Sequence, residues 1–296
     1  MSAVGPRTSL SHISAGRKAK DRAVEVLVYL AFVLAVIPLI SLLWLVISLG
    51  LKRFDADFFS HSMNAVGPLD AFGGAYHAII GTLEQVGLAT VMSVPIGVLT
   101  AIYLVEYARG GRLSKVVSFF VDVMTGIPSI VAALFVLAFW ILALGFGYSG
   151  FACALALFIL MLPTVVRATE EMLKLVPNDL REASFALGIP RWRTITFVVL
   201  PTALTGIVTG IMLAIARVMG ESAPLLVLAF GTTAINNNPF SQPQEALPLF
   251  IYNQATSGQP TSIDRAWTAA LTLILIIMLL NLGARLIARL RKTATR

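Results

Sequence analysis

The feature that most constrains this chain is a set of apolar runs long enough to cross a lipid bilayer. A membrane-spanning helix needs about 20 mostly apolar residues, because lipid offers no partner to an unpaired backbone group. Three runs carry no charge, namely Val26–Leu49, Tyr148–Val166 and Ala266–Ala284. Three more are interrupted by polar residues, namely Ile79–Leu104, Val116–Leu144 and Leu204–Phe230. We therefore predict an all-α integral membrane protein with six transmembrane helices.

The first apolar run follows a basic segment, so a cleaved signal peptide is the competing interpretation. The hydrophobic part of a signal peptide spans about 7 to 15 residues and is followed by a small-residue cleavage site. Val26–Leu49 is longer and has no such site close behind it. We interpret it as an uncleaved first helix.

The distribution of Lys and Arg predicts the orientation. Eighteen of them lie in the two tails and in the second and fourth connections, whereas three lie in the first and fifth. Positive residues stay on the cytoplasmic side, so both termini are predicted to be cytoplasmic. The net charge of +7 then needs no nucleic-acid partner. The predicted parts are a tail 1–22, a first helix 23–50, a periplasmic loop 51–73, a core 74–284 and a tail 285–296.

The connection 167–201 reads as a structured cytoplasmic loop. Pro177 ends the preceding helix, and Asp179 followed by Glu182 resembles a capping box that starts a short helix. Gly188 and Pro190 then end that helix. A short amphipathic helix here could lie in the headgroup region or serve as a docking element.

A motif in this loop favours docking. Glu182-Ala183-Ser184, Gly188 and Val198-Val199-Leu200-Pro201 resemble the E-A-A-x3-G-x9-I-x-L-P motif of ABC importer permeases. Ser184 replaces the second Ala of the motif and Val198 replaces its Ile. The resemblance implies a coupling helix that sits in a groove of an ATP-binding subunit, with Asp179 in its first turn and small side chains at Ala183 and Ser184. It also implies the type I importer permease (MetI-like) fold.

Further stretches resemble the A-type (PstA) permeases of phosphate importers over nearly the whole chain after the first helix. They are Gly73-Gly74, Gly81-Thr82-Leu83, Pro95-Ile96-Gly97, Tyr103 to Tyr107, Gly126 to Val131, Leu162-Pro163 and Ala216 to Ala223. Ser222 stands where that family usually has Thr. The resemblance implies a phosphate permease in the bacterial inner membrane. Its partners would be a second, PstC-type permease with which it forms a heterodimer, an ATPase dimer and an extracytoplasmic phosphate-binding protein.

Arg217 and Glu221 are the strongest candidates for a functional role within the predicted spans. Charged side chains at membrane depth are costly and normally face protein or a water-filled path. Arg217 and Glu221 continue a helical face of small residues that begins at Gly206 and Gly210. Arg offers a planar fork that matches phosphate oxygens, and Glu221 could neutralise it in an empty path. The alternative is a structural ion pair one helical turn apart.

Weaker candidates complete the predicted substrate path. Glu84 either lines the path or is solvated near the end of its span. Ser129 follows the Gly126-Ile127-Pro128 break, where freed backbone groups could meet substrate, although a simple kink is the commoner outcome. Ser222 keeps the family's hydroxyl. Asp122 is expected near Lys115 in a structural role. The outer loop 231–264 holds an apolar island, Leu247 to Tyr252, predicted to form a short re-entrant or surface helix near the binding-protein dock.

Other classes of protein fit less well. The chain has no G-x-x-x-x-G-K-[ST] loop, so ATP and Mg are expected on a partner subunit and no cofactor or catalytic site on this chain. Cys153 is the only cysteine and the three histidines are isolated, so no metal site is expected. A secondary transporter would show inverted repeats and buried carboxylates. A permease for molybdate, sulfate or an organic solute would share the coupling loop and is the remaining alternative.

Overall fold

The computed structural model describes residues 15–67, 69–108 and 110–294, and all regular elements among them are helical. The chain divides into two compact units, Met1–Ser48 and Leu49–Arg296. Predicted positions that lie outside the described residues are Arg7 and His12 in the N-terminal tail, Arg109, and Arg296 at the C-terminus.

The first unit contains most of helix α1 (Ala15–Gly50). Its apolar side chains are exposed over nearly the whole length of the helix, as a lipid-facing helix requires. The predicted run Val26–Leu49 lies within it.

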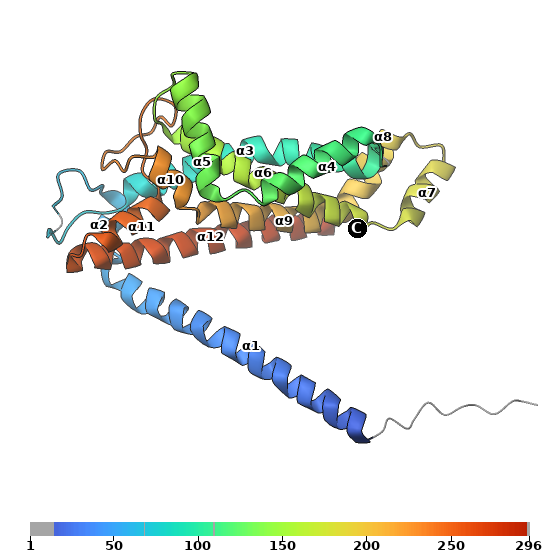
Figure 1. Cartoon of the computed structure of the whole chain (residues 1–296), viewed down its shortest axis with the longest axis horizontal. Helices are drawn as coiled ribbons and strands as arrows, with labels where there is room; N and C mark the ends of the chain where they lie inside the picture. Colours follow the sequence, from blue (N-terminus) through green and yellow to red (C-terminus); the bar gives the residue numbers. More distant parts are fainter. Residues whose placement is uncertain (1–14, 68, 109, 295–296) are drawn as a thin grey trace, which may run out of the picture. The chain divides into compact units, whose positions relative to one another are not determined.

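The second unit is a bundle of long helices with short helices at both ends (Figure 1). Its long helices are α3 (Tyr76–Ile102), α6 (Gly150–Lys174), α9 (Leu200–Met219) and α12 (Pro260–Ala294). Helix α6 is central, because it packs against α3, α9, α4 (Arg112–Thr125) and α5 (Ser129–Val136). The shorter elements are a 3-10 turn (Leu51–Arg53), α2 (Ala56–Ser60), α7 (Asn178–Ala186), α8 (Arg191–Thr194), α10 (Ala223–Leu228) and α11 (Leu247–Thr256). Three helices are extended by π-helical segments, Tyr103–Tyr107, Leu137–Ala143 and Ile195–Val199.

Small residues bring the central helices close together. A Cβ atom at Gly206 would lie 2.2 Å from the sulfur of Met172, and one at Gly210 would lie 2.6 Å from the Cβ of Ala168. Because neither glycine has a side chain, α9 packs directly against α6, as the helical face of small residues predicted. Gly97 makes the same kind of contact between α3 and Val165 of α6.

Five helices are long and apolar enough to cross a membrane, and a sixth span results if α4 and the helix that starts at Ser129 count as one. This agrees with the predicted six. The prediction that Leu204–Phe230 forms one continuous span was wrong, because α9 ends at Met219 and a break separates it from α10.

The predicted apolar island forms helix α11, which begins at Leu247. Leu247, Leu249 and Phe250 are buried, and the helix packs against α12 and α3. The end of the bundle that holds α11 is called the α11 end below, and the opposite end, with α7, the α7 end (Figure 1).

Candidate functional site

A polar cavity of about 190 Å³ lies where three helices are interrupted or kinked. Helices α4 and α5 meet at 105° across the Gly126-Ile127-Pro128 break, and Pro163 lies inside α6. The cavity is lined by both segments around the α4–α5 break, by α6 around Pro163 and Thr164, and by Arg217 and Glu221. Proline removes a backbone donor, and Pro128 directly precedes α5, which explains the interruption between α4 and α5, whereas α6 continues through Pro163. The predicted residues Ser129, Arg217 and Glu221, which come from two distant segments of the chain, line one cavity.

Arg217 and Glu221 belong to different local structures. Arg217 lies in the last turn of α9, whereas Glu221 follows the helix end at Gly220. The expectation that Glu221 continues the small-residue face of the helix was therefore wrong. Within the described part of the chain, no ion pair or side-chain hydrogen bond joins Arg217 to Glu221. Arg217 is exposed and Glu221 half-buried.

The N-terminus of α5 and the guanidinium of Arg217 favour an anion in the cavity. Helix α5 begins at Ser129, so the positive end of its dipole points to the cavity. Arg217 lies at the C-terminal end of α9, where a cation is favourable. An anion in this cavity would meet a guanidinium, a hydroxyl and a helix N-terminus together.

Two predicted path residues lie elsewhere. The amide of Gln244 donates a hydrogen bond to Glu84 Oε2 over 2.5 Å, which ties α3 to the outer loop. Ser222 precedes α10, where its carbonyl accepts hydrogen bonds from Leu225 and Leu226. The lining of the Arg217 cavity includes neither Glu84 nor Ser222. Their place on the substrate path stays a prediction.

The predicted docking loop forms two short helices joined by a tight turn. Helix α7 spans Asn178–Ala186, and Gly188 follows with a φ of +74°. Only glycine adopts this conformation without strain. The prediction of a capping box was wrong in detail. Pro177 occupies the N-cap position, where no side-chain hydrogen bond caps the helix, and Asp179 lies within the first turn. Glu182 and Ala183 are exposed, and Pro201 lies in the first turn of α9, directly after Leu200.

Ser184 has a different position from the one expected. It is buried, and its hydroxyl lies 2.7 Å from the hydroxyl of Thr194. Ser184 therefore joins α7 to α8 and does not present a surface for close approach. Small size still matters at this position, because it lets the two short helices pack against each other.

An ion pair that sequence reasoning missed fixes α7 to α3. Arg181 Nη2 lies 2.8 Å from Glu106 Oε1, and the two side chains are 13% and 6% exposed. Arg181 also donates to the carbonyls of Leu173 and Val176 at the end of α6. One guanidinium thus connects the short helix to two long ones. The available signal was a lone carboxylate, Glu106, at the end of an apolar span.

A second cluster of charges lies between α4 and α6. Arg167 pairs with Asp122 and with Glu170, and Glu170 also accepts from Lys174 over 2.7 Å. Asp122 was expected near Lys115, and its partner is instead Arg167, 45 residues away in sequence. Periodicity could not find that pair, because it depends on how α4 packs on α6.

Comparison with known proteins identifies the family. Residues 93–293 match the family described as binding-protein-dependent transport system inner membrane component. The chain belongs to this family. It is 50% identical over 281 residues to the phosphate transport system permease protein PstA 1 of Mycobacterium tuberculosis, covering 95% of this chain and 90% of that protein. It is 47% identical to PstA of Mycobacterium leprae, covering 92% and 90%, and 38% identical to PstA of Pasteurella multocida, covering 91% and 95%.

Solved structures support the same fold. A bacterial transporter that imports alginate has a TM-score of 0.64 at 18% identity, covering 92% of this chain and 98% of that one. The MetNI methionine ABC transporter has a TM-score of 0.57 at 22% identity, covering 73% of this chain and 93% of that one. At this identity the likeness concerns the fold alone, which is the MetI-like permease fold.

Proposed function

We propose that this permease is a membrane-spanning subunit of an ATP-driven importer of inorganic phosphate. The observation that carries the substrate assignment is its likeness, at up to 50% identity over 95% of the chain, to proteins named phosphate transport system permeases. The chemistry of the Arg217 cavity supports it independently, since a guanidinium and a helix N-terminus suit a tetrahedral anion.

Arg217 would bind the anion during passage. A guanidinium presents two parallel donors to two oxygens and stays charged at every physiological pH. Ser129 would offer a hydroxyl from the start of α5. Glu221 would balance the arginine when no anion is present, because the two share the cavity without being locked into an ion pair.

The α7 end would be cytoplasmic and would couple ATP hydrolysis to movement of the membrane helices. This chain would bind no cofactor and no metal of its own, and ATP and Mg would be held by a dimeric partner subunit. Helix α7 and the Gly188 turn would dock into that subunit, and Arg181 would pass the motion to α3 and α6. A PstC-type permease would complete the path, and a phosphate-binding protein would deliver the ion at the α11 end.

The substrate is tested by reconstitution. The permease with its second permease and ATPase subunits is placed in liposomes with the binding protein outside, and ATP-dependent uptake of radiolabelled phosphate, sulfate and molybdate is measured. We expect phosphate uptake that needs both ATP and the binding protein. Uptake of sulfate or molybdate in preference to phosphate would contradict the proposal and favour a sister oxyanion importer.

The orientation is tested by labelling with an impermeant thiol reagent. Cysteines are placed singly at Ala186 and Asn237, both exposed, after Cys153 is replaced by serine. The charge distribution predicts that reagent outside intact cells labels the cysteine at 237 alone. Labelling of both positions from one side would overturn the six-span topology.

A further inference from the structure

A second cavity, of about 210 Å³, lies at the α11 end. It is enclosed by the first turn of α3, by α11 and α12, and by the loops around residues 63–66 and 231–245. Its polar lining includes His77, Thr233, Glu245, Asn253 and Arg265. It shares no lining residue with the Arg217 cavity.

Two buried polar side chains in this cavity each have one atom without a hydrogen-bond partner in the described part of the chain. His77 is 3% exposed and Glu245 is 4% exposed, and among the described residues His77 Nδ1 and Glu245 Oε1 make no hydrogen bond. Buried polar atoms are nearly always paired, because leaving one unpaired costs the desolvation of that group. Two such atoms facing one cavity indicate a ligand that supplies their partners.

The position of Glu245 is fixed by its neighbours. A Cβ at Gly81 would lie 1.9 Å from the carbonyl oxygen of Glu245, so α3 and the loop are in direct contact. The preceding residue, Gln244, bonds to Glu84 and accepts from Gln85. The loop is therefore anchored to α3 at Gly81 and, about one turn further along, at Glu84 and Gln85, and the carboxyl group is held at the cavity.

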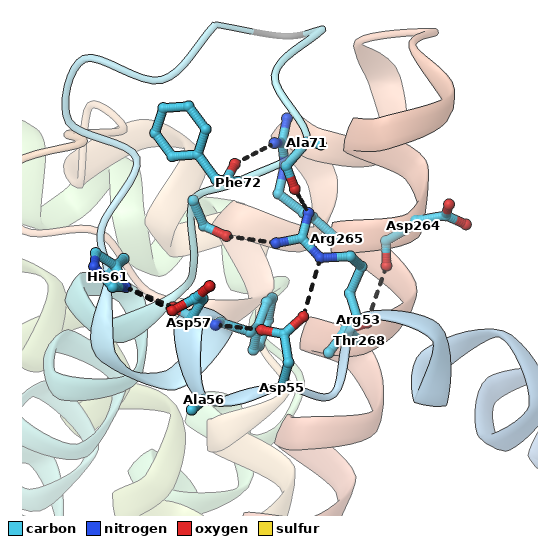
Figure 2. A network of polar contacts seen from close by, with 12 residues as sticks. Arg53, Asp55, Ala56, Asp57, His61, Ala71, Phe72, Asp264, Arg265 and Thr268 are labelled. Atoms are coloured by element: carbon cyan, nitrogen blue, oxygen red, sulfur yellow. Dashed lines mark hydrogen bonds and ion pairs between the residues drawn. The ribbon is translucent and has the colours of Figure 1, made fainter.

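Arg265 supplies a buried positive charge beside the cavity. Its side chain is wholly buried and donates to the carbonyls of Asp70 and Phe72, and Arg53 bonds to the neighbouring carbonyls of Ala71 and Gly73 (Figure 2). Arg265 also donates to Gln254 and Ser262. The guanidinium is thereby rigidly placed, and its charge acts on the cavity as a fixed field.

The charge of the cavity depends on one proton. Burial raises the pKa of Glu245 to about 8, so the acid is protonated below that pH and can donate a hydrogen bond. The groups that face it are His77 from α3, Arg265 from α12 and the thiol of Cys153 from α6. With Glu245 neutral, Arg265 gives the lining a net positive charge. The volume equals that of about seven waters, which is enough for one small hydrated oxyanion.

We propose that this cavity is an outer binding site for one inorganic phosphate ion, in which His77, Glu245 and Asn253 contact the ion and Arg265 attracts it. The inference rests on the proposed function, because it takes phosphate as the substrate. The site would hold the ion near the delivering protein before the ion moves to Arg217. Above the pKa of Glu245, ionisation replaces a donor with a like charge and weakens binding.

The test is protection of a cysteine at the cavity. Thr233 lines the cavity and is exposed, so Thr233→Cys in a Cys153→Ser background gives one reporter. The full complex in nanodiscs is labelled with an impermeant maleimide, with and without inorganic phosphate and with sulfate at equal ionic strength. At phosphate ten times above half-saturation we expect labelling about 10-fold slower, since only the unoccupied fraction reacts. Sulfate should protect less.

Matched variants at Glu245 isolate the acid. Glu245→Gln keeps size and a donor but cannot ionise, so protection should persist from pH 7 to pH 9. The parent should lose protection at pH 9, and Glu245→Leu, which has no donor, should lack protection at both values. Because phosphate has the same charge in all three samples at one pH, the comparison reports on Glu245 alone.

Three results would overturn the proposal. One is no protection of the parent at phosphate concentrations that saturate uptake. Another is an equal loss of protection at pH 9 in the parent and in Glu245→Gln. The third is protection that follows phosphatidylglycerol in the disc without added phosphate, which would assign the cavity to a lipid headgroup. The same complex is assayed for uptake, so phosphate import without protection refutes this site alone, whereas absence of phosphate import refutes the proposed function.

Discussion

The charged residues at the α7 end and those in the Arg217 cavity differ in whether they form ion pairs. At the α7 end, Arg181 pairs with Glu106, and Arg167 pairs with Asp122 and Glu170. In the Arg217 cavity, Arg217 and Glu221 share one space without an ion pair between them in the described structure. Among the described residues, oppositely charged side chains are joined by ion pairs at the α7 end and not in the Arg217 cavity.

The difference follows from where each helix ends. Glu170 and Lys174 lie one turn apart on the continuous helix α6, and Arg167 lies one turn before Glu170. Helix α9 stops at Met219, so Glu221 leaves the position from which it could meet Arg217. Under the proposed function, the paired charges would hold α7 and the neighbouring helices in place, whereas the unpaired charges of the Arg217 cavity would be available to a mobile ion. The following variants test this contrast in order of decreasing effect.

Loss of Arg181 should be the most damaging change at the α7 end. Arg181→Met leaves the buried carboxylate of Glu106 without its partner, and breaking a buried pair costs about 3 to 5 kcal/mol. We expect a large fall in the thermal unfolding midpoint of the purified complex. Arg193→Met is the matched control, because Arg193 is exposed on the same loop.

A double variant separates the pair from the individual residues. Glu106→Gln combined with Arg181→Met removes both charges and should recover much of the lost stability. If Arg181→Met had the same thermal unfolding midpoint as the parent, the ion pair would not be holding α7 to α3.

Distortion of the Gly188 turn should have a moderate effect on stability and a strong one on coupling. Gly188→Val forces a β-branched residue to a φ of +74°, at a cost of about 1 to 2 kcal/mol. The predicted result is normal membrane insertion with stimulation of ATP hydrolysis by loaded binding protein reduced about 10-fold. ATP hydrolysis in liposomes measures it.

Gly147→Val is the control for that variant, since Gly147 is also in open space but has no positive φ. Normal stimulation in Gly188→Val would show that the turn is not the coupling element.

Removal of the charge on Asp122 should have the smallest effect. Asp122→Asn breaks an ion pair whose acid is 65% exposed, and exposed pairs contribute about 0 to 1 kcal/mol. Arg167 keeps Glu170 and the carbonyl of Ser118. We expect a change in unfolding midpoint of a few degrees at most, and a shift as large as that of Arg181→Met would erase the distinction between buried and exposed pairs.

Sequence reasoning reached the fold because the bilayer imposes a length on every span. The apolar runs predicted the long helices, and the Gly126-Ile127-Pro128 break predicted the bend between α4 and α5. Gly188 was identified because few residues tolerate its backbone conformation. These signals are local, so they can be recognised in the sequence without knowledge of how the helices pack.

Contacts between distant segments could not be predicted in the same way. The pairing of Arg181 with Glu106 spans 75 residues, and that of Arg167 with Asp122 spans 45. The end of α9 at Met219 was also missed, because the apolar pattern continues beyond it to Phe230. Three of the predicted path residues meet in one cavity, but Glu84 does not, since its position depends on the loop that carries Gln244.

The central claim is that Arg217 and Glu221 serve a passing anion rather than each other. It is tested by uptake of radiolabelled phosphate for Arg217→Lys, Arg217→Gln, Glu221→Gln and the double Arg217→Gln with Glu221→Gln. Arg217→Lys should lose about 10-fold or more in uptake at normal expression, because an ammonium loses the bidentate fork. The double variant should transport no better than Arg217→Gln alone. Recovery of uptake in the double variant, with a mild effect of Arg217→Lys, would contradict the account and assign both residues to structure.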